Sequence, residues 1–318
     1  MKKITSLLIS SVILGIVFYK IDIPEFLRHM RQMHIVWFAL SLIMFVPQTL
    51  VSAMRWRVIS SRLCHISLGE SVKLILAGNT LNLILPSKMG DIAKAYFLNK
   101  EGKLELSGGL HIVVFEKVMD VVSLSLVMLM GILAARLTDY MGLVIALFGI
   151  GILSLGALIY FANITNSQIY RWFVHRFLCK IVGEKLSLMF DNVLSHASAL
   201  GVEFKKHRLL MPIVSLSIFL WVFHLVQFVC FFFALRAGVP VFQIFALVPV
   251  AIFIGLMPMT IGGIGTRDAA LIYLFSPYAP ASLIAGIGIF ATMRYIVPGL
   301  LGLPFFNQYA VGKQVRSN

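Results

Sequence analysis

The feature that most constrains this chain is a series of apolar runs, each close to the length that a helix needs to cross a bilayer. A membrane-spanning helix requires about 20 consecutive apolar residues. The sequence therefore predicts an all-α, polytopic membrane helix bundle with about six full transmembrane helices. The predicted spans are residues 4–21, 35–54, 118–137, 140–162, 209–235 and 281–306.

The composition excludes a soluble globular protein. Of the 318 residues, 59% are hydrophobic and 13% are charged, and the mean hydropathy is +0.94. An ordinary soluble domain is about half apolar and about a quarter charged. The widest gap between the apolar runs, residues 163–208, is too short to fold by itself. We therefore interpret residues 1–318 as a single integral membrane domain.

The basic residues indicate how the chain is oriented in the membrane. The formal charge is +14, which would also fit a nucleic-acid-binding protein, but Lys and Arg lie in short loops between the apolar runs. This distribution follows the positive-inside rule, so no nucleic-acid partner is expected. The most basic loop, residues 163–208, is predicted to be cytoplasmic. Six crossings then place both termini on the cytoplasmic side of a cell membrane.

Residues 163–208 are predicted to form an interfacial helical loop within the membrane domain. Apolar residues such as Trp172, Phe173 and Phe177 recur in it at helical spacing. This pattern indicates one or two helices that lie on the cytoplasmic face, with Lys and Arg toward anionic lipid. A solvated connector between two spans is the alternative.

Two further apolar regions, residues 71–85 and 241–257, are each followed by proline, glycine and a short second apolar segment. The charge count places the first on the cytoplasmic side and the second on the outer side, so they form an inverted pair of broken or re-entrant helical hairpins. Such a pair is typical of a transport site near the bilayer midplane. Two ordinary kinked spans are the alternative. The predicted breaks are Pro86, Gly90, Pro258, Gly262, Gly263 and Gly265.

Ionisable residues at membrane depth are the candidate ligand-binding residues, because an unpaired charge is costly there. Glu116 and Asp120 are four residues apart and Asp91 and Lys94 are three apart, so each pair shares a helical face. Mixed charges would keep the empty site neutral, and its cations could bind a phosphate together with the helix N-termini after Gly90 and Gly265. The predicted substrate-binding residues are Lys88, Asp91, Lys94, Glu116, Lys117, Asp120, Arg267, Asp268 and Arg294.

Arg294 is expected to be the central charge of this site. It has about a dozen apolar or small residues on either side, so its side chain is too far from either interface to snorkel cheaply. It therefore needs an internal acid, a water-filled cavity or a bound phosphate. Lys88, Lys94 and Lys117 have a simpler alternative, because they could snorkel to the cytoplasmic interface.

Other polar residues are interpreted as structural. The Arg55-Trp56-Arg57 sequence is expected to anchor a helix end at the lipid headgroups, and His111 and His224 are expected to be packed in apolar surroundings. The three cysteines have no metal-ligand spacing. The chain contains no GxSxG, HExxH or P-loop motif. We therefore predict no metal, no cofactor and no catalytic residue.

Three motifs follow one another as in a known family: Pro86-x-Lys88-x-Gly90-Asp91-x-x-Lys94, Glu116-Lys117-x-x-Asp120 and Pro258-x3-Gly262-Gly263-x-Gly265-x-Arg267-Asp268. They resemble the membrane region of lysylphosphatidylglycerol synthases, part of a broad family of flippase-like proteins, over nearly the whole chain. Lys117 stands where arginine is commoner in that family, and Asp91 and Asp268 where glutamate is commoner. Full synthases carry a soluble aminoacyl-transfer domain after this region, and the chain ends at Asn318. The resemblance therefore implies a protein that moves or binds a lipid and does not synthesise one.

The leading hypothesis is a translocase for a phosphate-containing lipid, either an aminoacyl-phospholipid or a polyprenyl-phosphate-linked lipid. The headgroup would enter a polar cavity between the inverted hairpins, held by Arg294, Arg267 and the lysines. One alternative is a membrane enzyme that transfers a group to a lipid, with a buried carboxylate as general base. Another is a non-transporting partner that holds a lipid-synthesising or glycosyl-transfer enzyme through the basic loop 163–208. Membrane lipids are the expected ligands of the translocase.

Overall fold

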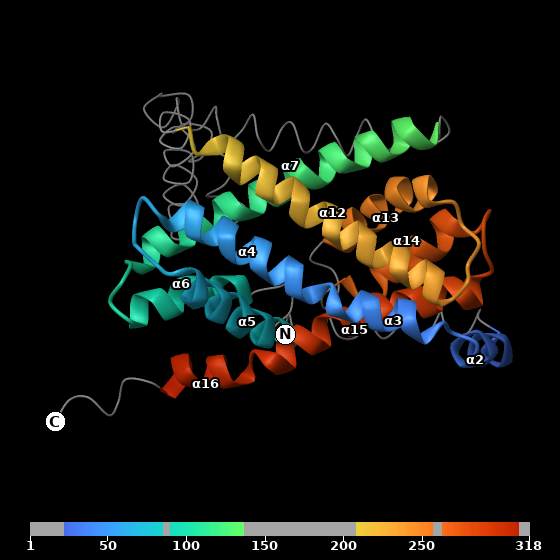
Figure 1. Ribbon diagram of the computed structural model, residues 1–318, viewed down its shortest axis with the longest axis horizontal. Helices are drawn as coiled ribbons and strands as arrows, with labels where there is room; N and C mark the ends of the chain where they lie inside the picture. The colour runs from blue at the N-terminus through green and yellow to red at the C-terminus, as the bar shows by residue number, and fades with distance from the viewer. Residues whose placement is uncertain (1–21, 85–89, 137–207, 257–262, 312–318) are drawn as a thin grey trace, which may run out of the picture.

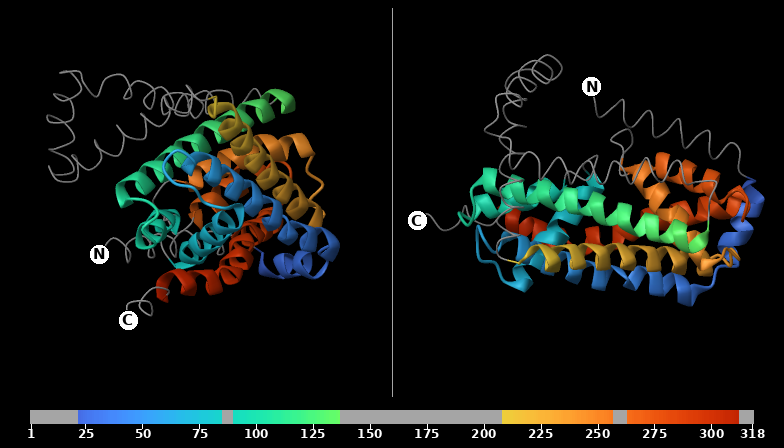
Figure 2. Two further views of the ribbon diagram at one scale, coloured as in Figure 1. Left: turned by 60° about the vertical axis from the view of Figure 1, so that its left-hand side comes forward. Right: turned by 90° about the horizontal axis from the view of Figure 1, so that it is seen from above.

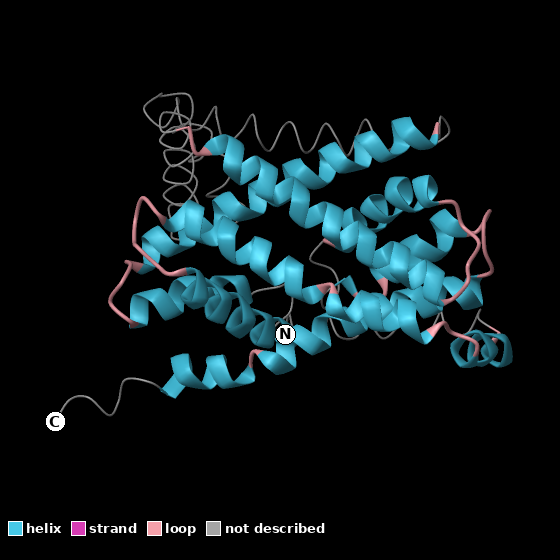
Figure 3. Ribbon diagram, viewed as in Figure 1, coloured by secondary structure: helices cyan, strands magenta, loops and turns pink. Residues whose placement is uncertain are grey.

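The computed structural model describes residues 22–84, 90–136, 208–256 and 263–311 (Figure 1). This part of the chain is helical and contains no strand, which confirms the all-α prediction for it (Figure 3). The helices, in chain order, are α2 (Ile23–Arg31), α3 (Ile35–Ile43), α4 (Phe45–Ser60), α5 (Leu68–Ile84), α6 (Gly90–Lys100), α7 (Leu106–Ala135), α12 (Leu210–Ala234), α13 (Val241–Gly255), α14 (Thr266–Phe275), α15 (Ala281–Leu301) and α16 (Leu303–Val311).

The described part of the chain contains four helical stretches that are long and apolar enough to cross a bilayer, so the chain is a multi-pass membrane protein. These stretches coincide with four of the six apolar runs that were predicted to span the membrane. The predicted spans at residues 4–21 and 140–162, and the predicted loop at 163–208, lie outside the described residues. The four stretches are Ile35–Ser60, which joins α3 and α4, Leu106–Ala135, Leu210–Ala234 and Ala281–Leu301.

The prediction of a span starting at residue 118 was wrong about where that helix begins. The helix α7 starts at Leu106, because its first turns pack closely on α6. A Cβ added at Gly109 would lie 2.6 Å from the Cβ of Ala95, so only glycine allows this approach. As a result, Glu116 does not open the helix but lies about three turns inside it.

The last apolar run is likewise divided, although a single span over residues 281–306 was predicted. The helix α15 ends at Leu301, and α16 begins at Leu303. Gly302 between them lies directly against the backbone carbonyl of Leu76 in α5, where a Cβ would overlap that oxygen. Thr80 of α5 also donates a hydrogen bond to the carbonyl of Gly299, at 2.7 Å. These contacts fix the end of α15 against α5.

Two pairs of short helices lie at opposite ends of the long axis of the molecule. The helices α5 and α6 pack on each other at one end, and α13 and α14 pack on each other at the other (Figures 1 and 2). In the first pair, a Cβ on Gly90 would overlap the carbonyl of Gly78. In the second, Gly263 has φ +77°, and a Cβ there would lie 2.8 Å from the carbonyl oxygen of Gly255. Glycine therefore sets the close packing of both pairs.

Of the predicted breaks, Gly90, Gly263 and Gly265 begin or precede a second short helix, as expected. Gly265 has φ +95°, a conformation that residues with a Cβ rarely adopt. Pro86, Pro258 and Gly262 lie outside the described residues.

The apolar core consists of two clusters, each associated with one of the short helix pairs. One cluster contains buried side chains of α13, α14, the first half of α15 and the second halves of α7 and α12. The other contains buried side chains of α4, α5, α6 and the first half of α7. The long helices α7 and α12 contribute to both clusters. They therefore connect the two halves of the bundle.

Candidate functional site

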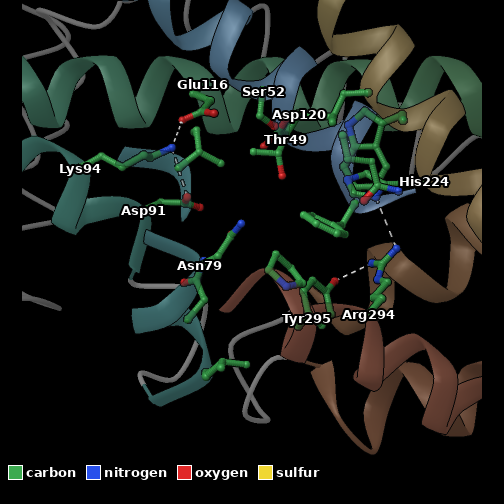
Figure 4. A pocket seen from close by; sticks show the side chains of 18 of the residues that line it. Thr49, Ser52, Asn79, Asp91, Lys94, Glu116, Asp120, His224, Arg294 and Tyr295 are labelled. Carbon is green, nitrogen blue, oxygen red and sulfur yellow. Dashed lines mark hydrogen bonds and ion pairs between the residues drawn. The ribbon is translucent and has the colours of Figure 1, made fainter. Parts of the chain in front are cut away.

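A cavity of about 370 Å³ lies between the two halves of the bundle. Its walls come from α4, α5, α6, α7, α12 and α15, and Ile264 next to α14 also reaches it. Figure 4 shows acidic and basic side chains on one side of the cavity and Arg294 with Tyr295 on the other. Such a cavity, in which polar and charged side chains converge inside an apolar bundle, is typical of a ligand-binding site.

Six charged side chains on the cavity wall form a closed ring in which cations and carboxylates alternate, which we call the charge ring. Each member contacts two others of opposite charge. The contacts are Arg55–Glu116 at 2.7 Å, Glu116–Lys94 at 2.7 Å, Lys94–Asp91 at 3.2 Å, Asp91–Lys117, Lys117–Asp120 at 3.5 Å and Asp120–Arg55 at 2.6 Å. With three cations and three carboxylates, the charge ring is formally neutral.

The spacing of the residues along their helices explains how the charge ring closes. Asp91 and Lys94 are one turn apart on α6, and Glu116 and Asp120 are one turn apart on α7, so each pair points in one direction. The structure thus brings opposite charges from these two segments into contact. Arg55 of α4 completes the ring by contacting both carboxylates of α7.

The two lysines of the charge ring differ in exposure. The side chain of Lys94 is 1% exposed, and its Nζ lies 4.3 Å from the ring centroid of Trp56. Lys94 therefore does not snorkel to an interface, which was the alternative interpretation of this residue. The side chain of Lys117 is 44% exposed but still contacts Asp91 and Asp120. Lys88 lies outside the described residues.

Arg294 lines the cavity on the side away from the charge ring and is 6% exposed (Figure 4). Its Nη2 donates to the Tyr295 hydroxyl at 2.5 Å, and its Nη1 lies 3.5 Å from both His224 Nδ1 and Gln227 Oε1. Its Nε is buried without a hydrogen-bond partner. No carboxylate in the described part of the chain forms an ion pair with this guanidinium. Of the three environments expected for Arg294, the structure thus provides the cavity.

Arg267 and Asp268 lie outside the cavity wall, where they join α14 to α15. Arg267 donates to Asp268 Oδ1 at 2.6 and 2.9 Å and to the backbone carbonyls of Gly288 and Ala291. It also donates to the hydroxyl of Thr292, which does line the cavity. Direct contact of Arg267 or Asp268 with a ligand stays a prediction.

The predicted helix N-termini have internal partners in this structure. The N–H of Gly90 donates to Asn82 Oδ1 at 2.8 Å, and the N–H of Gly265 donates to Asp268 Oδ2 at 3.0 Å. A ligand would therefore compete with these side chains for the first N–H of each helix.

Two residues of the site were given another role in the sequence analysis. Arg55 was predicted to anchor a helix end at the headgroups, but it is 2% exposed and bound inside the charge ring, so that prediction was wrong; Arg57 is exposed, as an anchor would be. His224 was expected to be packed in apolar surroundings, but it lines the cavity beside Arg294. A signal for Arg55 existed, since Gln48, Ser52 and Arg55 form a polar stripe at helical spacing on an apolar helix.

In the described residues, no three His, Cys, Asp or Glu side chains are grouped so that they could hold a metal ion. The described residues of the cavity wall offer charges and hydrogen-bonding groups, and among them Arg294 forms no ion pair with an acid. Such an arrangement suits the binding of an anion.

Comparison with known proteins shows a family and a relative to which the chain is similar. The family model described as the lysylphosphatidylglycerol synthase TM region matches residues 3–302. A UPF0104 membrane protein of Methanocaldococcus jannaschii is 24% identical over 272 residues, which cover 81% of each chain. No solved structure matches the chain.

Proposed function

This chain belongs to the family of the lysylphosphatidylglycerol synthase TM region, and on that premise we propose that it moves a phosphate-containing lipid across the cell membrane. The headgroup of the lipid occupies the cavity between the two halves of the bundle, and the tails stay in the surrounding bilayer. Two observations support this proposal. The family is named after a lipid synthase, and the chain has a polar cavity inside its apolar bundle.

The observation that carries the proposal is the charge balance of the cavity wall. The charge ring is neutral, and Arg294 adds one positive charge without a carboxylate partner among the described residues. A buried charge without a partner is costly, and an anion in the cavity would relieve that cost. A phosphate in a lipid headgroup is an anion that a guanidinium binds well.

The route across the membrane is proposed to run between the two short helix pairs. In this account α5–α6 is a re-entrant hairpin on the cytoplasmic side and α13–α14 is its inverted counterpart on the outer side. Both reach the cavity, the first through Asn79 and Asp91 and the second through Ile264. Rocking of one half of the bundle against the other would then expose the cavity to each side in turn.

The proposed orientation can be tested by labelling single cysteines. On a background without the three native cysteines, Lys103→Cys in the α6–α7 loop and Ala237→Cys in the α12–α13 loop should react with an impermeant thiol reagent from opposite sides. Reaction from the cytoplasm is expected for position 103 and from outside for position 237. Reaction of both from one side would contradict the proposed crossing of α7 and α12.

The proposed activity can be tested by reconstituting the purified protein in vesicles with phosphatidylglycerol labelled by a fluorophore on one acyl chain. An impermeant reductant bleaches only the outer leaflet, so transbilayer movement increases the fraction that is bleached. Chromatography of the extracted lipid detects chemical conversion in the same sample. Movement without conversion is expected, and conversion without movement would favour a lipid-modifying transferase instead. Vesicles that contain folded protein but show neither would leave only the role of a non-transporting partner.

A further inference from the structure

The polar groups of the cavity are of three kinds: the charge ring, the guanidinium of Arg294, and neutral hydroxyl and amide side chains. This division indicates the chemistry of the headgroup. We infer that the headgroup is a hydroxylated phosphodiester without an amine, in which Arg294 binds the phosphate and Thr49, Ser52 and Asn79 bind the hydroxyl groups. This inference rests on the proposed function for its ligand being a lipid, but the chemistry of the headgroup can be tested separately.

The phosphate is placed at Arg294 because this side chain has unused hydrogen-bonding capacity. Only its bond to the Tyr295 hydroxyl, at 2.5 Å, is short. Its contacts with His224 and Gln227, at 3.5 Å, are at the outer limit of hydrogen bonding, and its Nε has no partner. A phosphate oxygen beside this guanidinium would replace long contacts by short, charge-assisted ones.

The hydroxyl groups are placed in the middle of the cavity, where neutral polar side chains without a partner among the described residues can bind them. Thr49 and Ser52 lie one turn apart on α4, and Asn79 faces them from α5. Figure 4 shows Thr49 and Asn79 bordering the open space between the charge ring and Arg294. These three side chains form no hydrogen bond with another described residue. Uncharged donors and acceptors of this kind match the hydroxyl groups of a glycerol or a sugar.

An amine in the headgroup is disfavoured because the described residues of the cavity wall offer it no free carboxylate. Each of the three carboxylates on the wall already contacts two cations of the charge ring. A headgroup ammonium would have to compete for these carboxylates with the lysines and the arginine that they already contact. Unfavourable contacts of this kind exclude a wrong ligand as effectively as favourable contacts select the right one.

The test compares four short-chain lipids that share their acyl chains, in calorimetric titrations of the purified full chain in mild detergent. Phosphatidylglycerol has the inferred headgroup, and phosphatidylmethanol has the same charge but no hydroxyl group. Phosphatidylethanolamine and the lysyl ester of phosphatidylglycerol each add an amine. Phosphatidylglycerol should bind about tenfold more tightly than phosphatidylmethanol, which corresponds to one or two net hydrogen bonds. Both amine-containing lipids should bind more weakly than phosphatidylglycerol, again by about tenfold or more.

Variants connect this selectivity to the named residues. Thr49→Val and Asn79→Leu remove a polar group with little change of volume and should abolish the advantage of phosphatidylglycerol over phosphatidylmethanol. Ser61→Ala, near the end of α4 and outside the cavity wall, should leave that advantage intact. Equal or tighter binding of an amine-containing lipid, or full selectivity in Thr49→Val and Asn79→Leu, would overturn the inference.

The same assay separates a lipid from a water-soluble source of this headgroup. Glycerophosphoglycerol carries the identical headgroup chemistry without acyl chains. If it binds as tightly as the lipid, the headgroup inference holds and the lipid-transport proposal loses its support. If vesicles show rapid movement of all four lipids at equal rates, transport holds and the headgroup inference fails.

Discussion

Arg55 Nη2 lies 2.7 Å from Glu116 Oε1, although the two residues are 61 positions apart in the sequence. Their side chains are only 2% and 4% exposed. Arg55 Nη1 binds Asp120 at 2.6 Å, so one guanidinium joins α4 to α7 through two carboxylates. The fold therefore depends on Arg55, because its loss would leave the three buried carboxylates of the charge ring with only two cations.

Replacing Arg55 by glutamine should therefore destabilise the protein strongly. The change leaves Glu116 and Asp120 without their shared cation, and the expected loss of unfolding free energy is about 3–5 kcal/mol. The measurement is unfolding by a denaturing detergent in mixed micelles. Arg57→Gln is the matched control, because Arg57 is two residues away on the same helix and exposed. Equal stability of the two variants would show that the charge ring does not hold α4 to α7.

Arg294→Gln should have the opposite profile, with stability kept and ligand binding lost. Arg294 has no carboxylate partner among the described residues, so its removal leaves none of their acids without a partner. The unfolding free energy should change by about 1 kcal/mol or less, as expected for the loss of one hydrogen bond. Binding of short-chain phosphatidylglycerol should fall by at least about tenfold.

Arg294→Lys distinguishes a phosphate-binding fork from a simple positive charge. Lysine keeps the charge but cannot donate two parallel hydrogen bonds to one phosphate. Binding in this variant should therefore be close to that of Arg294→Gln. The measurement is the affinity of both variants for short-chain phosphatidylglycerol in calorimetric titrations. Wild-type affinity in Arg294→Lys would mean that a positive charge alone is sufficient for binding.

Arg267→Gln should destabilise the protein without changing which headgroup it prefers. Arg267 joins α14 to α15 through Asp268, Gly288 and Ala291 and does not line the cavity. The expected loss is about 3 kcal/mol or more, since Asp268 keeps its charge in a buried position. The ratio of affinities for phosphatidylglycerol and phosphatidylmethanol should equal that of the wild type. A changed ratio would indicate that Arg267 contacts the ligand, as the sequence motif suggested.

Gly90→Ala should disrupt the packing of α5 on α6. The new Cβ would overlap the carbonyl of Gly78, and backbone there cannot move without separating the helices. We expect a loss of about 1–3 kcal/mol, typical of overpacking. Gly69→Ala is the control, because no atom lies within 4 Å of a Cβ at that position in α5. In the control, the helix propensity of alanine should leave stability equal or slightly higher.

Much of the fold could be predicted from the sequence because the bilayer imposes a length on each apolar run. Four predicted spans correspond to helices, and the breaks at Gly90 and Gly265 mark the start of short helices. Boundaries were less predictable. The start of α7 at Leu106 depends on the contact between Gly109 and Ala95. Hydropathy alone does not reveal that these two segments pack on each other.

The candidate site was predictable where its residues lie on one helix and less so where distant helices meet. The spacing of Asp91 and Lys94, and of Glu116 and Asp120, is enough by itself to place each pair on one helical face. Arg55 was misassigned because it lies next to a basic loop, where an interfacial anchor is the common role. Its true partners belong to α7, and only the fold brings them together.

The most direct test of the account is the rate of transbilayer movement of labelled phosphatidylglycerol in vesicles that contain equal amounts of folded wild-type protein or Arg294→Gln. Movement by the wild type should be well above that in protein-free vesicles, and the rate in Arg294→Gln should fall to the protein-free level. Chromatography of the same lipid should detect no product. Undiminished movement in Arg294→Gln would contradict the claim that this arginine holds the phosphate during transport.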